Sequence, residues 1–271
     1  MFSSINKPLI MGILNITPDS FSDGGKFTSI DNALEQAESM LADGVGIIDI
    51  GGESTRPGSE PVDSAEQIRR VVPVITAIRQ QHEIPISIDT TCSIVAKAAL
   101  KAGATLINDI SAGLNDREIF TLAAQTHTPI ILMHSKGAPK TMQDNPHYDD
   151  VVAEVLIAIR RRIGAALAAG IPRHHIAIDP GIGFGKRKQD NLDLLAHLDK
   201  FVALGHAVLL GTSRKRFMGS ICDVSEPSEL ITATAVTTAL GVMNGVQMFR
   251  VHDVKENRQA LDVAWAIKQS R

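Results

Sequence analysis

Short apolar runs alternate with longer amphipathic stretches along nearly the whole chain. A short apolar run bounded by polar residues or glycine is typical of a buried strand, and apolar residues at helical spacing indicate a helix. Eight runs are predicted as strands, at residues 8–14, 46–50, 85–88, 105–108, 129–133, 176–179, 207–211 and 246–251. A helical stretch follows each run, so the pattern predicts parallel strands joined by right-handed crossovers.

Several of the helical stretches begin and end with recognisable signals. Asp63 with Glu66, Asn115 with Glu118 and Asp253 with Glu256 have the spacing of a capping box. The stretch 148–170 also has an expected end, because Gly170 suits a left-handed cap and Pro172 cannot continue a helix.

Eight βα units favour closure of the sheet, since an open doubly wound sheet usually has fewer strands and one switch point. The length of 271 residues agrees with the roughly 250 residues of a closed α/β barrel. No linker or low-complexity run divides the sequence. We therefore expect an α/β protein made of one domain over residues 1–271, a single (β/α)8 TIM barrel with its active site at the C-terminal ends of the strands.

Polar side chains gather directly after the predicted strands, which is where such a barrel carries its active site. In chain order they are Asn15 and Asp19, the segment DIGGESTRPGS at 49–59, Asp89, Asn108, Asp109, His134, Asp179, Ser213, Lys215, Arg250 and His252. Structural roles are open for some of them: Asp89, Asp109 and Asp253 suit helix N-caps, and His134 suits a hydrogen-bonded position at the rim. Capping does not explain why complementary charges follow most strands, so we favour a functional interpretation.

Composition and charge narrow the classes of partner. A net charge of -3 and a pI near 6.3 provide no basic surface for nucleic acid. No apolar run of 18 residues and no signal-peptide pattern occurs, so no membrane association is expected. The two cysteines, Cys92 and Cys222, are far apart and outside any CxxC motif, which favours a reducing, cytoplasmic location.

The polar residues fall into two groups by chemistry. A cationic, donor-rich group lies mainly after strands seven and eight, where TIM barrels often bind phosphate, and consists of Arg56, Ser213, Lys215, Arg250 and His252. Asp89, Asn108 and Asp179 form an acceptor-rich group that suits a ligand with several N–H donors, such as a 2-aminopyrimidinone edge. The two groups together predict a flat nitrogen heterocycle that carries phosphate.

Two other kinds of site are disfavoured. The segment GIGFGK is not a Walker A motif, because Pro180 and Arg187 stand where a glycine and a serine or threonine are needed. Zinc is poorly supported, since there is no HExxH and His174 and His175 precede strand six. Mg2+ held by Asn15 and substrate phosphate oxygens is the expected metal.

At this point the motifs are identifiable. In order from residue 9 to the C-terminal helix, the sequence resembles the dihydropteroate synthase family in MGILNITPDSFSDGG, DIGGESTRPGS, SIDT, NDIS, MHSKGAPKTMQ, DPGIGFGK, GTSRK and RVHDVKE. The resemblance implies a TIM-barrel transferase, usually a homodimer, in tetrahydrofolate biosynthesis. Its reaction joins 6-hydroxymethyl-7,8-dihydropterin diphosphate to p-aminobenzoate and releases diphosphate.

The resemblance also implies roles for individual residues. The pterin ring would contact Asp89, Asn108, Met133, Asp179, Gly211 and Lys215; the diphosphate would contact Thr55, Arg250, His252 and the Mg2+ on Asn15; and p-aminobenzoate would contact Phe21, Arg56, Pro57, Phe184 and Ser213. Catalytic roles are expected for Asp19, Lys215, Arg250 and His252, with no serine or cysteine nucleophile. The loops after strands one and two would close as a lid that keeps water from a cationic intermediate.

Two alternatives remain open from the sequence. One is a methyltetrahydrofolate:corrinoid methyltransferase-like pterin-binding barrel, which has no need for the cationic group. The other is a non-catalytic pterin-binding paralogue.

Overall fold

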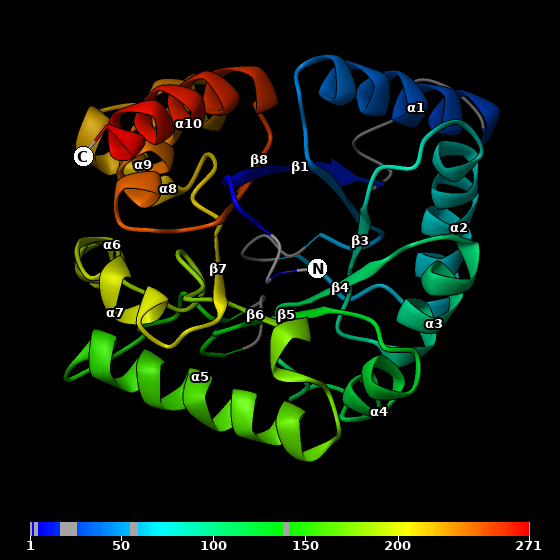
Figure 1. Ribbon diagram of the computed structural model, residues 1–271, viewed down its shortest axis with the longest axis horizontal. Helices are drawn as coiled ribbons and strands as arrows, with labels where there is room; N and C mark the ends of the chain where they lie inside the picture. The colour runs from blue at the N-terminus through cyan, green and yellow to red at the C-terminus, as the bar shows by residue number, and fades with distance from the viewer. Residues whose placement is uncertain (1, 3–4, 17–25, 55–58, 138–140, 271) are drawn as a thin grey trace.

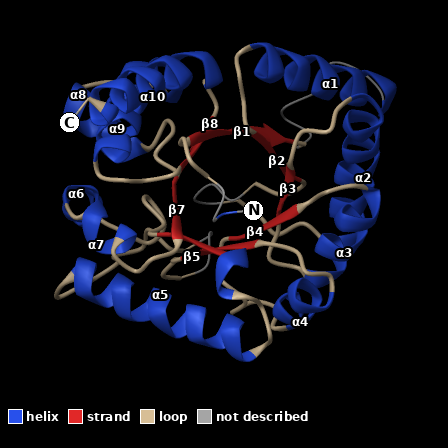
Figure 2. Ribbon diagram, in the orientation of Figure 1, coloured by secondary structure: helices blue, strands red, loops and turns tan. Residues whose placement is uncertain are grey.

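The protein forms a closed ring of parallel strands surrounded by helices (Figures 1 and 2). The computed structural model describes residues 2, 5–16, 26–54, 59–137 and 141–270, with no side-chain description for 26–29. Neighbours in the ring follow chain order, and the last strand pairs with the first, which closes the barrel. The expected (β/α)8 TIM barrel is confirmed.

The described residues contain eight strands, each within two residues of its predicted position. The strands are β1 (Leu9–Asn15), β2 (Ile47–Gly51), β3 (Ile86–Asp89), β4 (Leu106–Asp109), β5 (Ile130–Met133), β6 (Ile176–Asp179), β7 (Ala207–Leu210) and β8 (Met248–Val251). The surrounding helices are α1 (Lys26–Ala42), α2 (Ser64–Gln81), α3 (Ser93–Ala102), α4 (Glu118–Gln125), α5 (Val151–Ala168), α6 (Lys188–Ala196), α7 (Leu198–Val202), α8 (Arg216–Cys222), α9 (Ile231–Met243) and α10 (Val254–Gln269).

The predicted helix ends are correct in part. Asp63 caps α2 by accepting the Glu66 N–H at 2.9 Å, and Gly170 has the expected left-handed φ of 93° after α5. The Asn115 cap is wrong: Asp116 accepts the N–H of Glu118 at 3.0 Å instead.

The predicted Asp253 cap is also wrong, although α10 does begin directly after this residue. Asp253 makes no capping hydrogen bond, because its carboxylate is bound by the Arg214 guanidinium at 2.5 and 3.0 Å. An ion pair across the rim has replaced the local cap.

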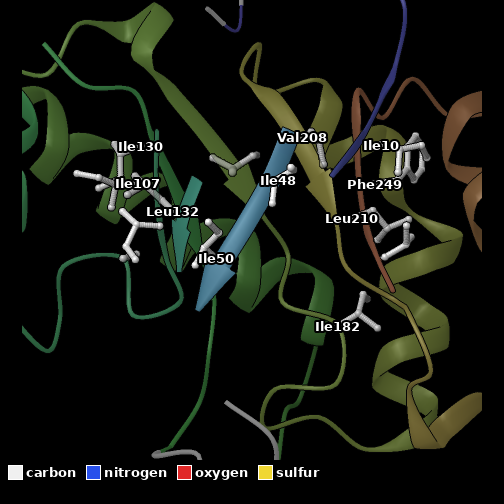
Figure 3. Packing of buried hydrophobic residues seen from close by; sticks show 14 of the residues in the cluster. Ile10, Ile48, Ile50, Ile107, Ile130, Leu132, Ile182, Val208, Leu210 and Phe249 are labelled. Carbon is white, nitrogen blue, oxygen red and sulfur yellow. The ribbon is translucent and has the colours of Figure 1, made fainter. Parts of the chain in front are cut away.

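Side chains on the strands alternate between the barrel interior and the surrounding helices, as the period of two requires. Outward-facing residues such as Ile48, Ile50 and Ile107 join the main apolar core against the helices (Figure 3). A separate apolar cluster fills the inside of the barrel near the amino ends of the strands. Its members are Phe2, Met11, Ile47, Leu106, Ile131, Ala177, Leu209 and Met248.

The barrel interior changes from apolar to polar two residues further along the same strands. Two residues beyond Ile47, Leu106 and Ala177, the inward positions hold Asp49, Asn108 and Asp179. The strand register therefore brings residues from distant parts of the chain to one polar rim.

Among the described residues, no helix is both long and apolar enough to cross a membrane.

Candidate active site

A cavity of about 700 Å³ opens at the carboxyl ends of the strands. Strands and loops from both halves of the barrel contribute to it, so residues far apart in sequence meet there. The predicted site residues in its wall are Asn15, Asn108, Met133, Asp179, Phe184, Gly211, Ser213, Lys215, Arg250 and His252. Asp19, Phe21, Thr55, Arg56 and Pro57 lie outside the described residues.

Asp179 ends β6 as a buried acceptor in the cavity wall, with 4% of the residue exposed. The Gly181 N–H donates to its Oδ1 at 2.6 Å, which fixes the carboxylate. Burial raises the pKa of Asp179 to about 6, and the Gly181 hydrogen bond and nearby cations oppose the shift. A charged carboxylate here is costly without donors, so a ligand with N–H groups would complete its hydrogen bonding.

The loop that follows Asp179 after β6 lies unusually close to the backbone of residues 134 and 136, and this contact fixes the loop. Gly181 has a positive φ of 69°, and a Cβ on it would lie 1.8 Å from the His134 carbonyl oxygen. Gly185, with φ of 61°, would place a Cβ 2.1 Å from the carbonyl oxygen of Lys136. Both contacts leave room for glycine alone, which explains why DPGIGFGK is rich in glycine.

Lys186 fixes this loop by hydrogen bonds to its backbone carbonyls, and this role was not predicted from the sequence. Only 3% of the residue is exposed, and its Nζ donates to the carbonyls of Gly181 at 2.8 Å and Phe184 at 3.0 Å. The same Nζ lies 3.0 Å from His134 Nδ1. Burial lowers the pKa of Lys186 to about 7, and burial together with Lys186 lowers the pKa of His134 to about 3. His134 is therefore a neutral acceptor, which agrees with the structural role left open for it.

A second buried network links Arg250 to two carboxylates. The Arg250 guanidinium donates through Nε to Asp49 Oδ2 and through Nη2 to Asp89 Oδ2, both at 2.6 Å. Burial opposes the charge on Arg250, but the two carboxylates outweigh it, and the pKa of Arg250 is raised. Burial raises the pKa of Asp89 to about 7, with Arg250 opposing the shift.

This network places Asp89 differently from the other predicted ring contacts. Arg250 and Asn108 line the cavity, whereas Asp89 does not contribute to its wall and lies against Arg250. Asp109, the other candidate on this side, points away: its carboxylate accepts the N–H groups of Ser111 and Gly113 at 2.8 and 2.6 Å. Asp109 therefore organises the loop after β4, a local role close to the capping that its position suggested.

The donor-rich side of the cavity comes from the ends of β7 and β8. Ser213 Oγ lies 2.9 Å from His252 Nδ1, and the His252 backbone N–H donates to the same Oγ at 3.1 Å. The Lys215 Nζ lies 4.1 Å from the centroid of the Phe184 ring, a cation–π distance. These residues give one wall of the cavity the donors that a phosphate group requires.

Comparison with known proteins agrees with this geometry. Residues 11–252 match the family of pterin binding enzymes. The chain belongs to this family. The match runs from within β1 to the end of β8, so it covers both groups of polar residues that the fold brings to one rim.

Within the pterin-binding enzymes, the relatives of this chain include dihydropteroate synthases. The chain is 45% identical over 267 residues to the Synechocystis sp. enzyme, covering 98% of this chain and 92% of the relative. It is 48% identical over 255 residues to the enzyme from Streptococcus pyogenes serotype M6, covering 94% of this chain and 93% of the relative.

Solved structures show the same likeness. The Yersinia pestis dihydropteroate synthase with a sulfonamide drug has a TM-score of 0.92 at 41% identity, covering 98% of this chain and 96% of that one. The Xanthomonas albilineans enzyme in complex with 7,8-dihydropteroate has a TM-score of 0.89 at 40% identity, covering 98% and 95%. The family that the sequence motifs indicated is confirmed.

Proposed function

We propose that this protein is a dihydropteroate synthase that condenses 6-hydroxymethyl-7,8-dihydropterin diphosphate with p-aminobenzoate, giving 7,8-dihydropteroate and diphosphate. The observation that carries the proposal is that hydrogen-bond acceptors suited to the ring and donors suited to a phosphate group line one cavity. Asp179 and Asn108 provide acceptors for the aminopyrimidinone edge, and Ser213, Lys215 and His252 provide donors and charge on another wall. Enzymes of this name are the chain's relatives at 45 and 48% identity.

The proposed reaction breaks the C–O bond between the pterin methylene and the diphosphate, and forms a C–N bond to the aryl amine. The amine loses a proton and the diphosphate leaves with the electron pair of the C–O bond. The cationic wall stabilises the charge that develops on the leaving group. Asp179 orients the ring and, as an anion, favours positive charge on it. An aryl amine is already nucleophilic, so no strong general base is needed.

Mg2+ is proposed as the metal, and the residues present fit it. Asn15 ends β1 in the cavity wall and offers an amide oxygen, and no group of three His, Cys, Asp or Glu suited to a metal occurs among the described residues. Mg2+ usually takes one or two protein oxygens together with substrate phosphates. When bound, it would neutralise charge on the diphosphate.

The p-aminobenzoate contact is proposed beside Phe184 and Ser213, the described members of the group expected for it. The Xanthomonas albilineans relative has been solved with 4-aminobenzoic acid, at a TM-score of 0.91 and 42% identity. Sulfonamides resemble this substrate, so they are expected to compete with p-aminobenzoate in initial-rate kinetics. A non-competitive pattern would contradict the proposed second-substrate position.

A homodimer is proposed, with α9 and α10 as the contact surface. Val236, Leu240, Val263 and Ile267 are each more than half exposed on these two helices. A groove of about 600 Å³ lined largely by alanine and aliphatic side chains runs between them. Leu240→Glu is expected to shift the molar mass measured by light scattering from dimer to monomer, whereas Leu114→Glu, at an exposed leucine elsewhere, leaves it unchanged.

A cytoplasmic location is also proposed, supported by two cysteines that form no disulfide.

Turnover tests the proposed activity directly. Purified protein with Mg2+ and both substrates should release diphosphate and dihydropteroate in equal amounts. Lys215→Met is expected to lower kcat/KM about a hundredfold, because it removes a cation from the cavity. Lys200→Met, at an exposed lysine on α7, is the matched control.

The two alternatives predict different products. A corrinoid methyltransferase-like protein would consume methyltetrahydrofolate and release no diphosphate. A non-catalytic paralogue would bind the pterin without turnover. Either result would overturn the proposed function.

A further inference from the structure

Asp49 connects two residues of the cavity wall without reaching the cavity itself. It lies on β2 with 0% of the residue exposed. Its Oδ2 accepts from Arg250 Nε at 2.6 Å and from Asn108 Nδ2 at 3.2 Å. Arg250 and Asn108 line the cavity, so one buried carboxylate holds two residues that face the ligand.

The contact with Asp49 fixes which end of the Asn108 amide faces the cavity. An amide carries one donor end and one acceptor end, and an ionised carboxylate accepts hydrogen bonds only. The NH2 end of Asn108 must therefore face Asp49, because the reverse orientation would place two oxygens together. Asn108 Oδ1 is left as the acceptor on the side of the ligand.

The same contact fixes the plane of the Arg250 guanidinium. Nε is held by Asp49 and Nη2 by Asp89, so the group is gripped along one edge. A planar guanidinium with one edge held presents its remaining N–H groups in a set direction. Because Arg250 lines the cavity, Asp49 and Asp89 together determine how its charge is presented there.

Asp49 occupies this position at a cost to stability. Its Oδ1, the Oδ1 of Asp89 and the hydroxyl of Ser87 are buried without a hydrogen-bond partner among the described residues. Buried polar atoms of this kind are rare in native proteins, and apolar residues of similar size commonly give more stable interiors. Costly buried groups concentrate at functional sites, which favours a role for Asp49 in the site over a role in stability.

We propose that Asp49 is a positioning residue that sets ligand specificity: by holding the amide of Asn108, it makes the pterin site select a ring edge rich in N–H donors. The inference rests on the proposed function, because it concerns the same ring. A second consequence is that Asp49 keeps Arg250 aimed at the diphosphate.

The test compares two ring ligands by calorimetry. The first is 6-hydroxymethylpterin, and the second is 6-hydroxymethyllumazine, in which a carbonyl oxygen replaces the 2-amino donor. The ratio of their dissociation constants measures selection for donors and is insensitive to a uniform loss of affinity. In Asp49→Leu no acceptor remains at this position and the amide of Asn108 is free to turn, so the ratio is expected to fall by about fivefold to a hundredfold.

The conservative variant separates positioning from loss of charge. In Asp49→Asn the amide oxygen can take the place of Asp49 Oδ2 and still accept from both Arg250 Nε and Asn108 Nδ2. The ratio in this variant is therefore expected to stay within about threefold of the wild-type value. Asp109→Leu is the matched control, because Asp109 is equally buried at the end of β4 but bonds only its own loop.

Three results would overturn the inference. One is an unchanged ratio in Asp49→Leu. Another is an Asp49→Asn variant that keeps the wild-type melting temperature but loses the wild-type ratio, which would show that the hydrogen bond to Asn108 does not set the selection. The third uses the wild type alone, and so covers variants that fail to fold: the 15N-labelled Asn108 amide protons should stay protected from exchange with and without 6-hydroxymethylpterin, and rapid exchange of both would contradict a fixed amide. Failure of the proposed function would instead appear as wild-type protein without turnover.

Discussion

The two ends of the barrel interior are built on the same strands yet differ in almost every property. Near the amino ends, Met11, Ile47 and Leu106 pack with other apolar residues in a closed cluster. Two residues further along β2 and β4 the inward side chains are Asp49 and Asn108, and they belong to a polar network. The alternation is the same at both ends, so position along the strand, and not the fold itself, separates stabilising residues from those placed for chemistry.

Loss of Arg250 is expected to damage the polar end most severely. Arg250→Gln leaves the buried carboxylates of Asp49 and Asp89 without their cation, and breaking a buried pair in this way costs about 3 to 5 kcal/mol. The free energy of unfolding in urea measures this change. Arg214→Gln breaks the more exposed pair with Asp253 and is expected to cost about 1 kcal/mol or less. Equal losses in the two variants would show that the Arg250 network is not a special feature of the site.

A substitution that leaves a void at the apolar end of the barrel is expected to affect stability alone. Ile47→Ala removes a fully buried side chain from the interior cluster and is expected to lower the free energy of unfolding by about 2 to 5 kcal/mol. The affinity for 6-hydroxymethylpterin should stay at the wild-type value in the folded variant, since Ile47 belongs to the interior apolar cluster and does not line the cavity. A matching loss of affinity would break the separation between the two ends.

Asp179→Asn is expected to show the opposite behaviour. The fold should persist because the asparagine oxygen still accepts the Gly181 N–H. Pterin binding should weaken by about 1 to 3 kcal/mol, since one acceptor becomes a donor that faces a donor. Calorimetry measures the affinity, and unchanged binding would remove Asp179 from the ring site.

The pH dependence of binding sharpens the role of Asp179. Its folded-state pKa of about 6 lies above the ordinary value near 4, so the folded, ligand-free protein holds a proton that the unfolded chain has lost in this window. The free energy of unfolding therefore falls as pH rises from about 4 to 6. Ligand binding has the opposite sign, because N–H donors need the charged carboxylate.

Pterin affinity is accordingly expected to rise with pH, by at most about tenfold per unit, up to about pH 6 and then to level off. Asp89 and Lys186 have pKa values of about 7 and also titrate nearby, so Asp179→Asn serves as the control. If the slope below pH 6 persists in this variant, it belongs to another group.

The contrast between the ends also explains what the sequence could and could not predict. Strand positions and the barrel were predictable because the hydrophobic period is local and occurs eight times in the described chain. The rim was predictable because strand ends are recognisable in sequence. Asn108 and Asp109 are adjacent, so the alternation of side chains along a strand already places them on opposite faces of β4. The interpretation of both as rim residues did not take this alternation into account.

Other features depended on partners that the sequence does not place. The role of Asp49 comes from Arg250, which lies 201 residues away in the chain. Lys186 belongs to the DPGIGFGK motif, which contributed to the family resemblance but gave this lysine no role, and its burial follows from the turn that the glycines allow. Asn115 and Asp253 matched a local capping pattern, but a neighbouring aspartate and a distant arginine respectively determined the outcome.

A crystal structure with a non-hydrolysable analogue of the pterin diphosphate tests the central claim most directly. We expect the aminopyrimidinone edge against Asp179 and Asn108, and the phosphate groups at Ser213, Lys215 and His252 in the same cavity. A ring bound outside this cavity, or a diphosphate that does not reach the ends of β7 and β8, would contradict the account.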